Sequence, residues 1–190
     1  GVVDVIESCC PSIQDAWAMP NVDVDSTLIA IRIASYGNEM DFTSTCPKCG
    51  ESHEYAIDLS NVLHSITPAD YSKEYEIEGL TFKFRPPAYF EFNKSNMIAF
   101  EEQQILRTLG NMEDDPDGAK TMFDKQLGKL VDLNILMMAD STDYIETADG
   151  TIVSDHKYIE EFYQNCDTKV VKQIREQLDE YSKIGGLKPI

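Results

Sequence analysis

The chain has 190 residues, of which 42% are hydrophobic, enough for one domain with a core or for one domain and a small module. Its 34 acidic and 16 basic residues give a net charge of −18, which repels phosphate backbones and anionic membrane surfaces. We therefore expect no direct binding to nucleic acid or to membranes. No apolar run approaches the roughly 20 residues that cross a bilayer, and no signal-peptide pattern opens the chain, so we expect a soluble, unsecreted protein.

The N-terminal third is predicted to hold two helices. Apolar residues at helical spacing predict the first over residues 2–10, which Pro11 ends, and a connector follows over 14–24. The second is expected over 27–36, capped by Asp25 or Ser26. Apolar residues cover most of its circumference, so we expect it to be largely buried. Its β-branched composition also fits a strand.

Two antiparallel hairpins are predicted next. Residues 39–43 and 53–59 alternate polar with apolar side chains, as half-buried strands do, and should pair with the turn 46–50 at their tip. Residues 74–77 and 80–84 should form a second hairpin.

The remainder is predicted to be mainly helical. Long helices are expected over 89–109 and 119–140, separated by an acidic loop at 112–118 and with Gly110 closing the first helix. We expect an apolar stripe of the second helix to face the core. This stripe consists of Met122, Phe123, Leu127, Leu130, Val131, Asn134, Ile135 and Met138.

An Asp-Gly turn then predicts a third hairpin, near 144–153, and two more helices end the chain. The expected fold class is therefore α+β, with a helix-rich body and small antiparallel hairpins, one of which carries a zinc-ribbon-like knuckle. We expect residues 1–87 to form a region of N-terminal helix, knuckle and hairpins. Residues 88–190 should form a helical region.

The five cysteines indicate free thiols. They occur as an adjacent pair, a Cys-x-x-Cys and the single Cys166, which is not the pattern of a secreted disulfide framework. Cys46 and Cys49, with Pro47 between them and Gly50 after them, are typical of half a zinc-ribbon site.

Zn²⁺ is the one candidate cofactor. A tetrahedral zinc site needs four ligands, so Cys46 and Cys49 need two more, and the candidates are Cys9, Cys10 and His53. The alternative is a knuckle-shaped turn without metal. A thioredoxin-like redox role is disfavoured, because that motif opens a helix rather than capping a hairpin.

No catalytic constellation is visible. The three histidines are scattered, and neither a phosphate-binding glycine loop nor a paired-histidine metal helix is present in the sequence. We therefore expect no enzymatic activity, and an enzyme with a site hidden from sequence reading remains the alternative.

Four runs in the first third carry a family resemblance. They are VIESCCPSI at 5–13, AWAMPNVDVD at 16–25, LIAIRIASYG at 28–37 and TCPKCG at 45–50. In this order they resemble the baseplate hub subunit family of T4-like tailed phages. Family members carry a further N-terminal arm, and because this chain begins at Gly1 we expect that such a piece precedes it.

The resemblance implies a protein of the contractile-tail baseplate, either built into the hub or acting during hub assembly, without enzymatic activity. It implies other baseplate or hub proteins as partners, an oligomeric state set by the assembly, and a location in the virion tail baseplate or in the host cytoplasm during assembly. A zinc-ribbon adaptor or chaperone of a host cell is the alternative function.

The residues themselves suggest contact positions. Large amphipathic side chains dominate interface energetics, which favours the aromatic residues near turns, Trp17, Tyr71 and Tyr89, as partner contacts. Alternatively, Trp17 fills a groove in its own domain. Strong acidity fits either role, because it steers encounters with complementary partners and keeps an assembly component soluble.

Overall fold

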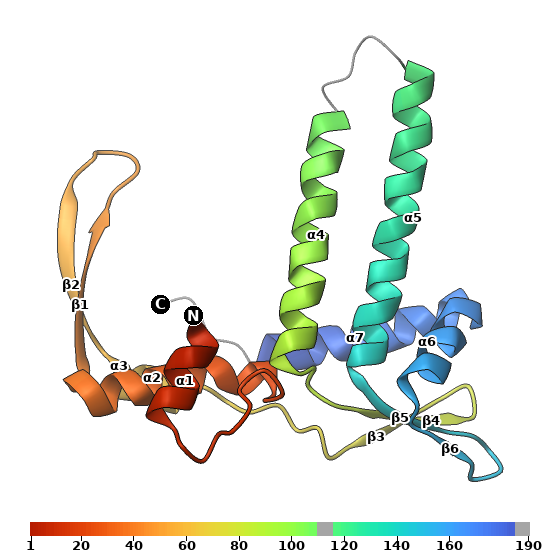
Figure 1. Cartoon of the computed structure of the whole chain (residues 1–190), viewed down its shortest axis with the longest axis horizontal. Coiled ribbons are helices and arrows are strands. Elements are labelled where there is room, and N and C mark those ends of the chain that lie inside the picture. The colour runs from red at the N-terminus through yellow and green to blue at the C-terminus, as the bar shows by residue number, and fades with distance from the viewer. Residues whose placement is uncertain (110–115, 185–190) are drawn as a thin grey trace. The chain divides into compact units, whose positions relative to one another are not determined.

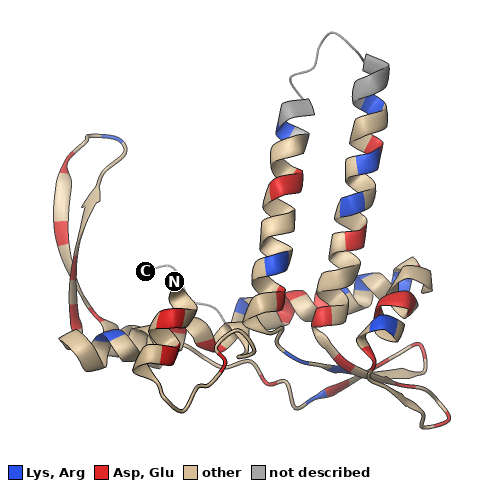
Figure 2. Cartoon of the chain, in the orientation of Figure 1, with Lys and Arg blue, Asp and Glu red and all other residues tan. Residues whose placement is uncertain are grey.

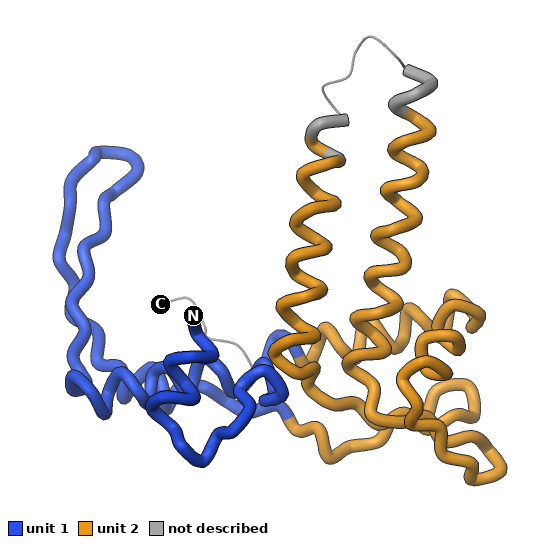
Figure 3. Tube along the Cα trace, in the orientation of Figure 1, with its two compact units in different colours: residues 1–69, 182–190 blue, residues 70–181 orange. Residues whose placement is uncertain are grey.

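The structure is a computed structural model that describes residues 1–109 and 116–184 (Figure 1). It confirms the α+β class, with seven helices and two antiparallel sheets in the described residues. The chain divides into two compact units, shown in Figure 3. The first comprises residues 1–69 and the C-terminal segment from 182, and the second comprises residues 70–181. The hairpin at 74–84 thus belongs to the second unit.

The first unit contains α1 (Val2–Cys9), α2 (Asn21–Tyr36) and α3 (Leu59–Ser65). The first helix ends as predicted. The second begins at Asn21, earlier than predicted, because the hydroxyl of Ser26 donates to the Asp23 carbonyl inside the helix rather than capping it. The third helix was not predicted.

The expectation that α2 is largely buried was wrong. Only Val24 of this helix is buried, and the apolar residues of its second half are partly exposed. The unit has a small core, which consists of Val3, Ile6, Ala16, Val24 and Leu59. An apolar circumference predicts burial only where enough neighbouring elements exist to cover it, and the described residues of this unit supply few.

The cysteine turn joins β1 (Glu39–Thr45) to β2 (Ser52–Asp58), which pair antiparallel as predicted. The prediction of half-buried strands was wrong, because only Met40 and Ile57 are partly buried and the other residues are exposed. In Figure 1 the hairpin extends well beyond the helices of its own unit. It is therefore a free two-stranded ribbon.

The sheet of the second unit joins two predicted hairpins. One is formed by β3 (Glu74–Ile77) and β4 (Leu80–Phe84), and the other by β5 (Thr142–Glu146) and β6 (Ile152–Val153). The sheet order is β3-β4-β5-β6, and all neighbours are antiparallel. The pairing of β4 with β5 was not predicted, because sequence alternation does not specify a partner more than fifty residues away in the chain.

The core of the second unit lies around this sheet, α6 (His156–Asn165) and α7 (Thr168–Ile184). Its most deeply buried large side chains are Phe82, Phe84, Ile159, Tyr163 and Ile174. The Thr142 hydroxyl donates to the Met138 carbonyl (2.8 Å), so the Tyr163 hydroxyl donates to Thr142 Oγ1 (2.7 Å). This chain of hydrogen bonds joins the end of α5 to α6.

Two long helices, α4 (Tyr89–Leu109) and α5 (Pro116–Asp140), pack against each other and project beyond the rest of their unit (Figure 1). The second begins at Pro116, before the predicted start, since proline is favoured in the first turn of a helix. The predicted loop at 112–118 was wrong for residues 116–118, which are helical, while its residues 112–115 and the predicted end at Gly110 lie outside the described residues. None of the described helices is long and apolar enough to span a membrane.

Candidate protein interfaces and cysteine turn

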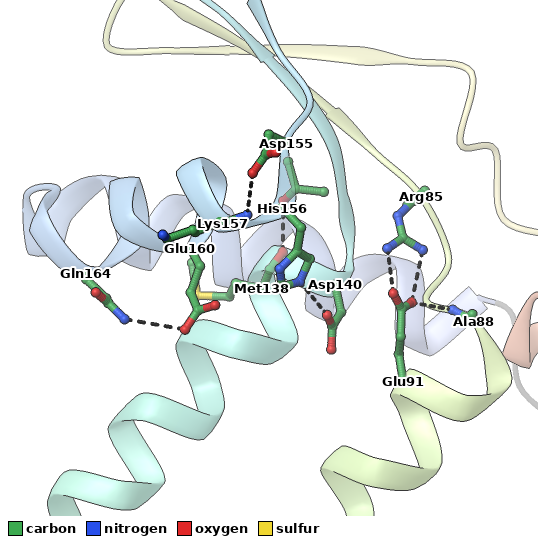
Figure 4. A network of polar contacts seen from close by, with 11 residues as sticks. Arg85, Ala88, Glu91, Met138, Asp140, Asp155, His156, Lys157, Glu160 and Gln164 are labelled. Atoms are coloured by element: carbon green, nitrogen blue, oxygen red, sulfur yellow. Dashed lines mark hydrogen bonds and ion pairs between the residues drawn. The ribbon is translucent and has the colours of Figure 1, made fainter.

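The base of the α4–α5 pair is fixed by a partly buried ion pair (Figure 4). Arg85, which follows β4, donates two hydrogen bonds to the carboxylate of Glu91, at 3.0 and 2.9 Å. The Ala88 amide donates a third, at 2.7 Å. Burial opposes ionisation of Glu91, but the Arg85 and Ala88 hydrogen bonds and the Arg85 charge lower its pKa overall. The first turn of α4 is therefore attached to β4 by an ionised carboxylate.

The end of α5 is attached by a second pair. Asp140 Oδ1 and His156 Nε2 are joined by a hydrogen bond of 2.6 Å, which links the last residue of α5 to the first residue of α6 (Figure 4). Burial raises the pKa of Asp140, and the His156 hydrogen bond opposes that rise. Both helices are therefore attached at their bases to the rest of the second unit, which fixes the direction in which the pair projects from it.

The side chains buried on these two helices include several polar ones. Ser95 and Glu102 on α4 and Gln126 on α5 are buried. Lys129 donates to one carboxylate oxygen of Glu102, at 3.2 Å. Over the described range, the Ser95 hydroxyl, the second Glu102 oxygen and the Gln126 carbonyl lack hydrogen-bond partners. A polar seam of this kind contributes little to holding two helices together.

Many large apolar side chains of the same helices are exposed, each between 38% and 65%, whereas Leu133 and Met138 on α5 are buried. The exposed ones are Phe90, Phe92, Met97 and Phe100 on α4 and Met122, Phe123, Leu127, Val131 and Met137 on α5. Because α4 and α5 form an antiparallel helical hairpin, we call these side chains the hairpin apolar residues. The prediction that the α5 stripe faces the core was right for Met138, which is buried, and Leu130 and Ile135 are partly buried. It was wrong for the exposed members of the stripe, which are Met122, Phe123, Leu127, Val131 and Asn134.

The sequence analysis missed this surface because helical periodicity identifies residues that share a face but not what covers them. Phe123, Leu127 and Val131 follow one another at intervals of four residues and so form a continuous ridge along α5. A usable signal was present: the two helices carry more large apolar residues than one antiparallel neighbour can cover. Charged residues of both signs are spread along both helices (Figure 2).

The cysteine turn lies at the tip of β1–β2 as predicted, but the predicted zinc-ribbon knuckle is not confirmed. The Cys46 amide donates to the Glu51 carbonyl (2.8 Å), and the Gly50 amide donates to the Cys46 carbonyl (2.9 Å). Gly50 has a φ of +74°, which glycine adopts without strain. Backbone N–H groups of Cys49 and Lys48 and the Cys49 thiol hydrogen bond to the Cys46 sulfur and lower its pKa.

The structure does not gather the predicted zinc ligands. In the part of the chain that it describes, no group of three or more His, Cys, Asp or Glu side chains could hold a metal ion. Cys9 ends α1 and Cys10 follows it. His53 Nε2 lies 3.8 Å from the carboxylate of Glu51. Cys46 and Cys49 are therefore together, but the candidates for the other two ligands are not with them.

The predicted contact aromatics lie in different surroundings. Trp17 is 47% exposed and its amide donates to Asp15. Tyr89 begins α4 and is partly exposed. Tyr71 stacks on Tyr181 with ring centroids 4.3 Å apart, and burial raises its pKa. Their role as partner contacts stays a prediction.

The fold and these surfaces define a class of α+β protein with exposed apolar side chains on a projecting helix pair. A family model described as T4 bacteriophage base plate protein matches residues 1–185. The chain belongs to this family and is a structural component of a phage base plate, which implies a location in the virion tail and contact with other base plate proteins. Family membership favours a structural over a catalytic role. No curated protein and no solved structure matches the chain.

Proposed function

We propose that this chain is a component of the baseplate hub, built into it or acting in its assembly, and that it docks through the hairpin apolar residues. The occupant of that surface is an apolar helix of another hub protein, flanked by basic side chains. This proposal takes the hub assignment from the sequence resemblance and the docking surface from the α4–α5 pair.

The single observation that carries the docking proposal is that this helix pair exposes many large apolar side chains while it buries polar ones in addition to Leu133, Met138 and Ala139. Ser95, Glu102 and Gln126 are buried, whereas Phe100 and Phe123 are about half exposed or more. Soluble helices normally place apolar residues against their own core. Large exposed apolar surface is typical of sites that another protein covers.

The ridge geometry supports a helical occupant. Side chains at intervals of four residues form a ridge that fits the groove between turns of a second helix. Phe123, Leu127 and Val131 supply such a ridge. On α4, the exposed Met97 and Phe100 offer a partner further adaptable and aromatic side chains.

Charge supports a basic partner. The net charge of −18 repels acidic proteins at long range and attracts basic ones. The sequence from 113 to 117 contains four acidic residues, Glu113, Asp114, Asp115 and Asp117. A basic flank beside an apolar helix complements both features and would accelerate docking.

Quantitative peptide mass spectrometry tests the hub proposal. Hub assembly intermediates from infected cells and finished phage particles are purified, and the chain is quantified against other hub proteins. Presence in both at hub stoichiometry identifies a built-in component, and presence only in the intermediates, in the host cytoplasm, identifies an assembly factor. Absence from both overturns the proposal and favours the host adaptor or chaperone instead.

A further inference from the structure

The turn that carries Cys46 and Cys49 is closed by backbone hydrogen bonds. Two backbone hydrogen bonds, Cys46 N–H to Glu51 and Gly50 N–H to Cys46, fix the turn at the end of the β1–β2 ribbon. The turn places Cys46 and Cys49 at its two ends, and both side chains are at least partly exposed. Two sulfur atoms are therefore presented at the ribbon tip, at the spacing of half a thiolate metal site.

This pair is half of a closed tetrahedral site. A structural Zn²⁺ site has four ligands, and Cys46 and Cys49 supply two. No third His, Cys, Asp or Glu side chain joins them in residues 1–109 and 116–184. The carboxylate nearest to the turn, Glu51, accepts from the Cys49 thiol at 3.9 Å and lies 3.8 Å from His53.

We propose that two copies of this chain share one Zn²⁺, with each copy supplying Cys46 and Cys49 from the tip of its β1–β2 ribbon. A two-fold axis through the metal sets the same pair opposite itself, which gives four thiolates in a tetrahedral arrangement. Each thiol releases its proton to solvent when the metal binds, and zinc undergoes no redox change. This inference does not rest on the docking role of α4–α5.

The ribbon itself favours a second copy as the occupant. A two-stranded hairpin is marginally stable alone, and this one is exposed along nearly its whole length. Phe42 and Tyr55 stack across the strands with centroids 5.3 Å apart and remain 38% and 48% exposed. Contact between two ribbon tips would cover part of this surface.

Charge at the tip also fits the shared site. A zinc ion with four thiolates carries a net negative charge, since four negative sulfurs exceed its two positive charges. Lys48 lies between the two ligands in sequence, so two copies bring two ammonium groups to the metal. Glu51 and the net charge of −18 on each chain oppose the pairing, so the binding of Zn²⁺ to the four thiolates has to outweigh this repulsion.

The test measures metal content and mass together on the full chain. The protein is purified under reducing conditions with Zn²⁺, its bound zinc is determined by elemental mass spectrometry, and its mass is determined by sedimentation. We expect one zinc ion for every two chains and a dimer that a chelator dissociates. Titration with Co²⁺ should give the visible absorption of tetrahedral thiolate coordination.

Variants locate the ligands. Cys46→Ser should lose both the metal and the dimer, whereas the control Cys166→Ser should keep both. The double variant Cys9→Ser, Cys10→Ser should also keep both, because the proposal assigns those thiols no part.

The proposal is overturned if the unmutated chain binds no zinc, or binds one ion per chain as a monomer. It is also overturned if the Cys9, Cys10 double variant loses the metal. Because the stoichiometry is measured on the unmutated chain, the test holds even if Cys46→Ser fails to fold. The outcome is independent of whether the chain is found in hub intermediates.

Discussion

Replacing Phe100 with serine should separate the docking surface from the stability of the chain. Phe100 lies on α4 and is 62% exposed. If its ring is covered by a partner helix in the hub, most of the loss on substitution should appear in association rather than in folding.

The magnitude follows from the area that remains open. An aromatic side chain buries roughly 200 Å² when fully covered, so 62% exposure leaves about 120 Å² for a partner to cover. At ~25 cal/mol per Å² this corresponds to about 3 kcal/mol, or about a hundredfold in the dissociation constant. The part of the Phe100 side chain that is already covered within the chain is about 80 Å². Its loss should lower the free energy of unfolding by at most about 2 kcal/mol.

Tyr158 provides a matched control, since it is also an aromatic residue on a helix and is also 62% exposed. Tyr158→Ser should have a similar effect on the free energy of unfolding, measured by urea denaturation. Association is measured by titrating each labelled variant into purified hub intermediates that lack the chain. If Phe100→Ser binds as tightly as the unmutated chain, or no more weakly than Tyr158→Ser, the assignment of the surface is refuted.

Three further substitutions test local contacts by urea denaturation. Because the pKa of Glu91 is lowered in the folded chain, its contribution is full above its ordinary value of 4.5 and is lost as pH falls through the folded value. Glu91→Gln should therefore cost about 1.5 kcal/mol at neutral pH, with no difference at low pH, and an equal loss at both would contradict this. Tyr163→Phe removes the bond to Thr142 and should cost about 1 kcal/mol; an unchanged midpoint would count against that bond. Asp155→Ala removes the cap of α6 and should cost about 1 kcal/mol, whereas Asp155→Asn should cost little.

Local chemistry in the sequence predicted the short elements well. The Glu78-Gly79 turn between β3 and β4 was located correctly, and both residues have positive φ, as a tight hairpin turn requires. Asp155 caps α6 in the way that is common for aspartate before a helix, since its carboxylate accepts from the amides of Lys157 and Tyr158. Proline, glycine and capping residues influence the backbone only within a few positions, so their effect can be predicted from the local sequence.

Burial was predicted poorly because it depends on partners that a local pattern does not name. The α5 ridge of Phe123, Leu127 and Val131 has the spacing of a core-facing stripe, but it is exposed. Two other features also depend on tertiary structure. They are the pairing of β4 with β5 and the separation of Cys46 and Cys49 from the other candidate zinc ligands. A pattern of apolar residues marks a surface that something covers, whether in the same chain or in another.

The most direct test of the docking account places a photocrosslinking amino acid at Phe123, on the exposed ridge of α5. Hub intermediates that contain the variant are irradiated, and the crosslinked peptides are identified by mass spectrometry, with the same probe at Tyr158 as the control. We predict that the probe at Phe123 crosslinks to a helix of one other hub protein and that the control does not. Crosslinks only to a second copy of the chain, or none from intermediates that contain it, would contradict the account.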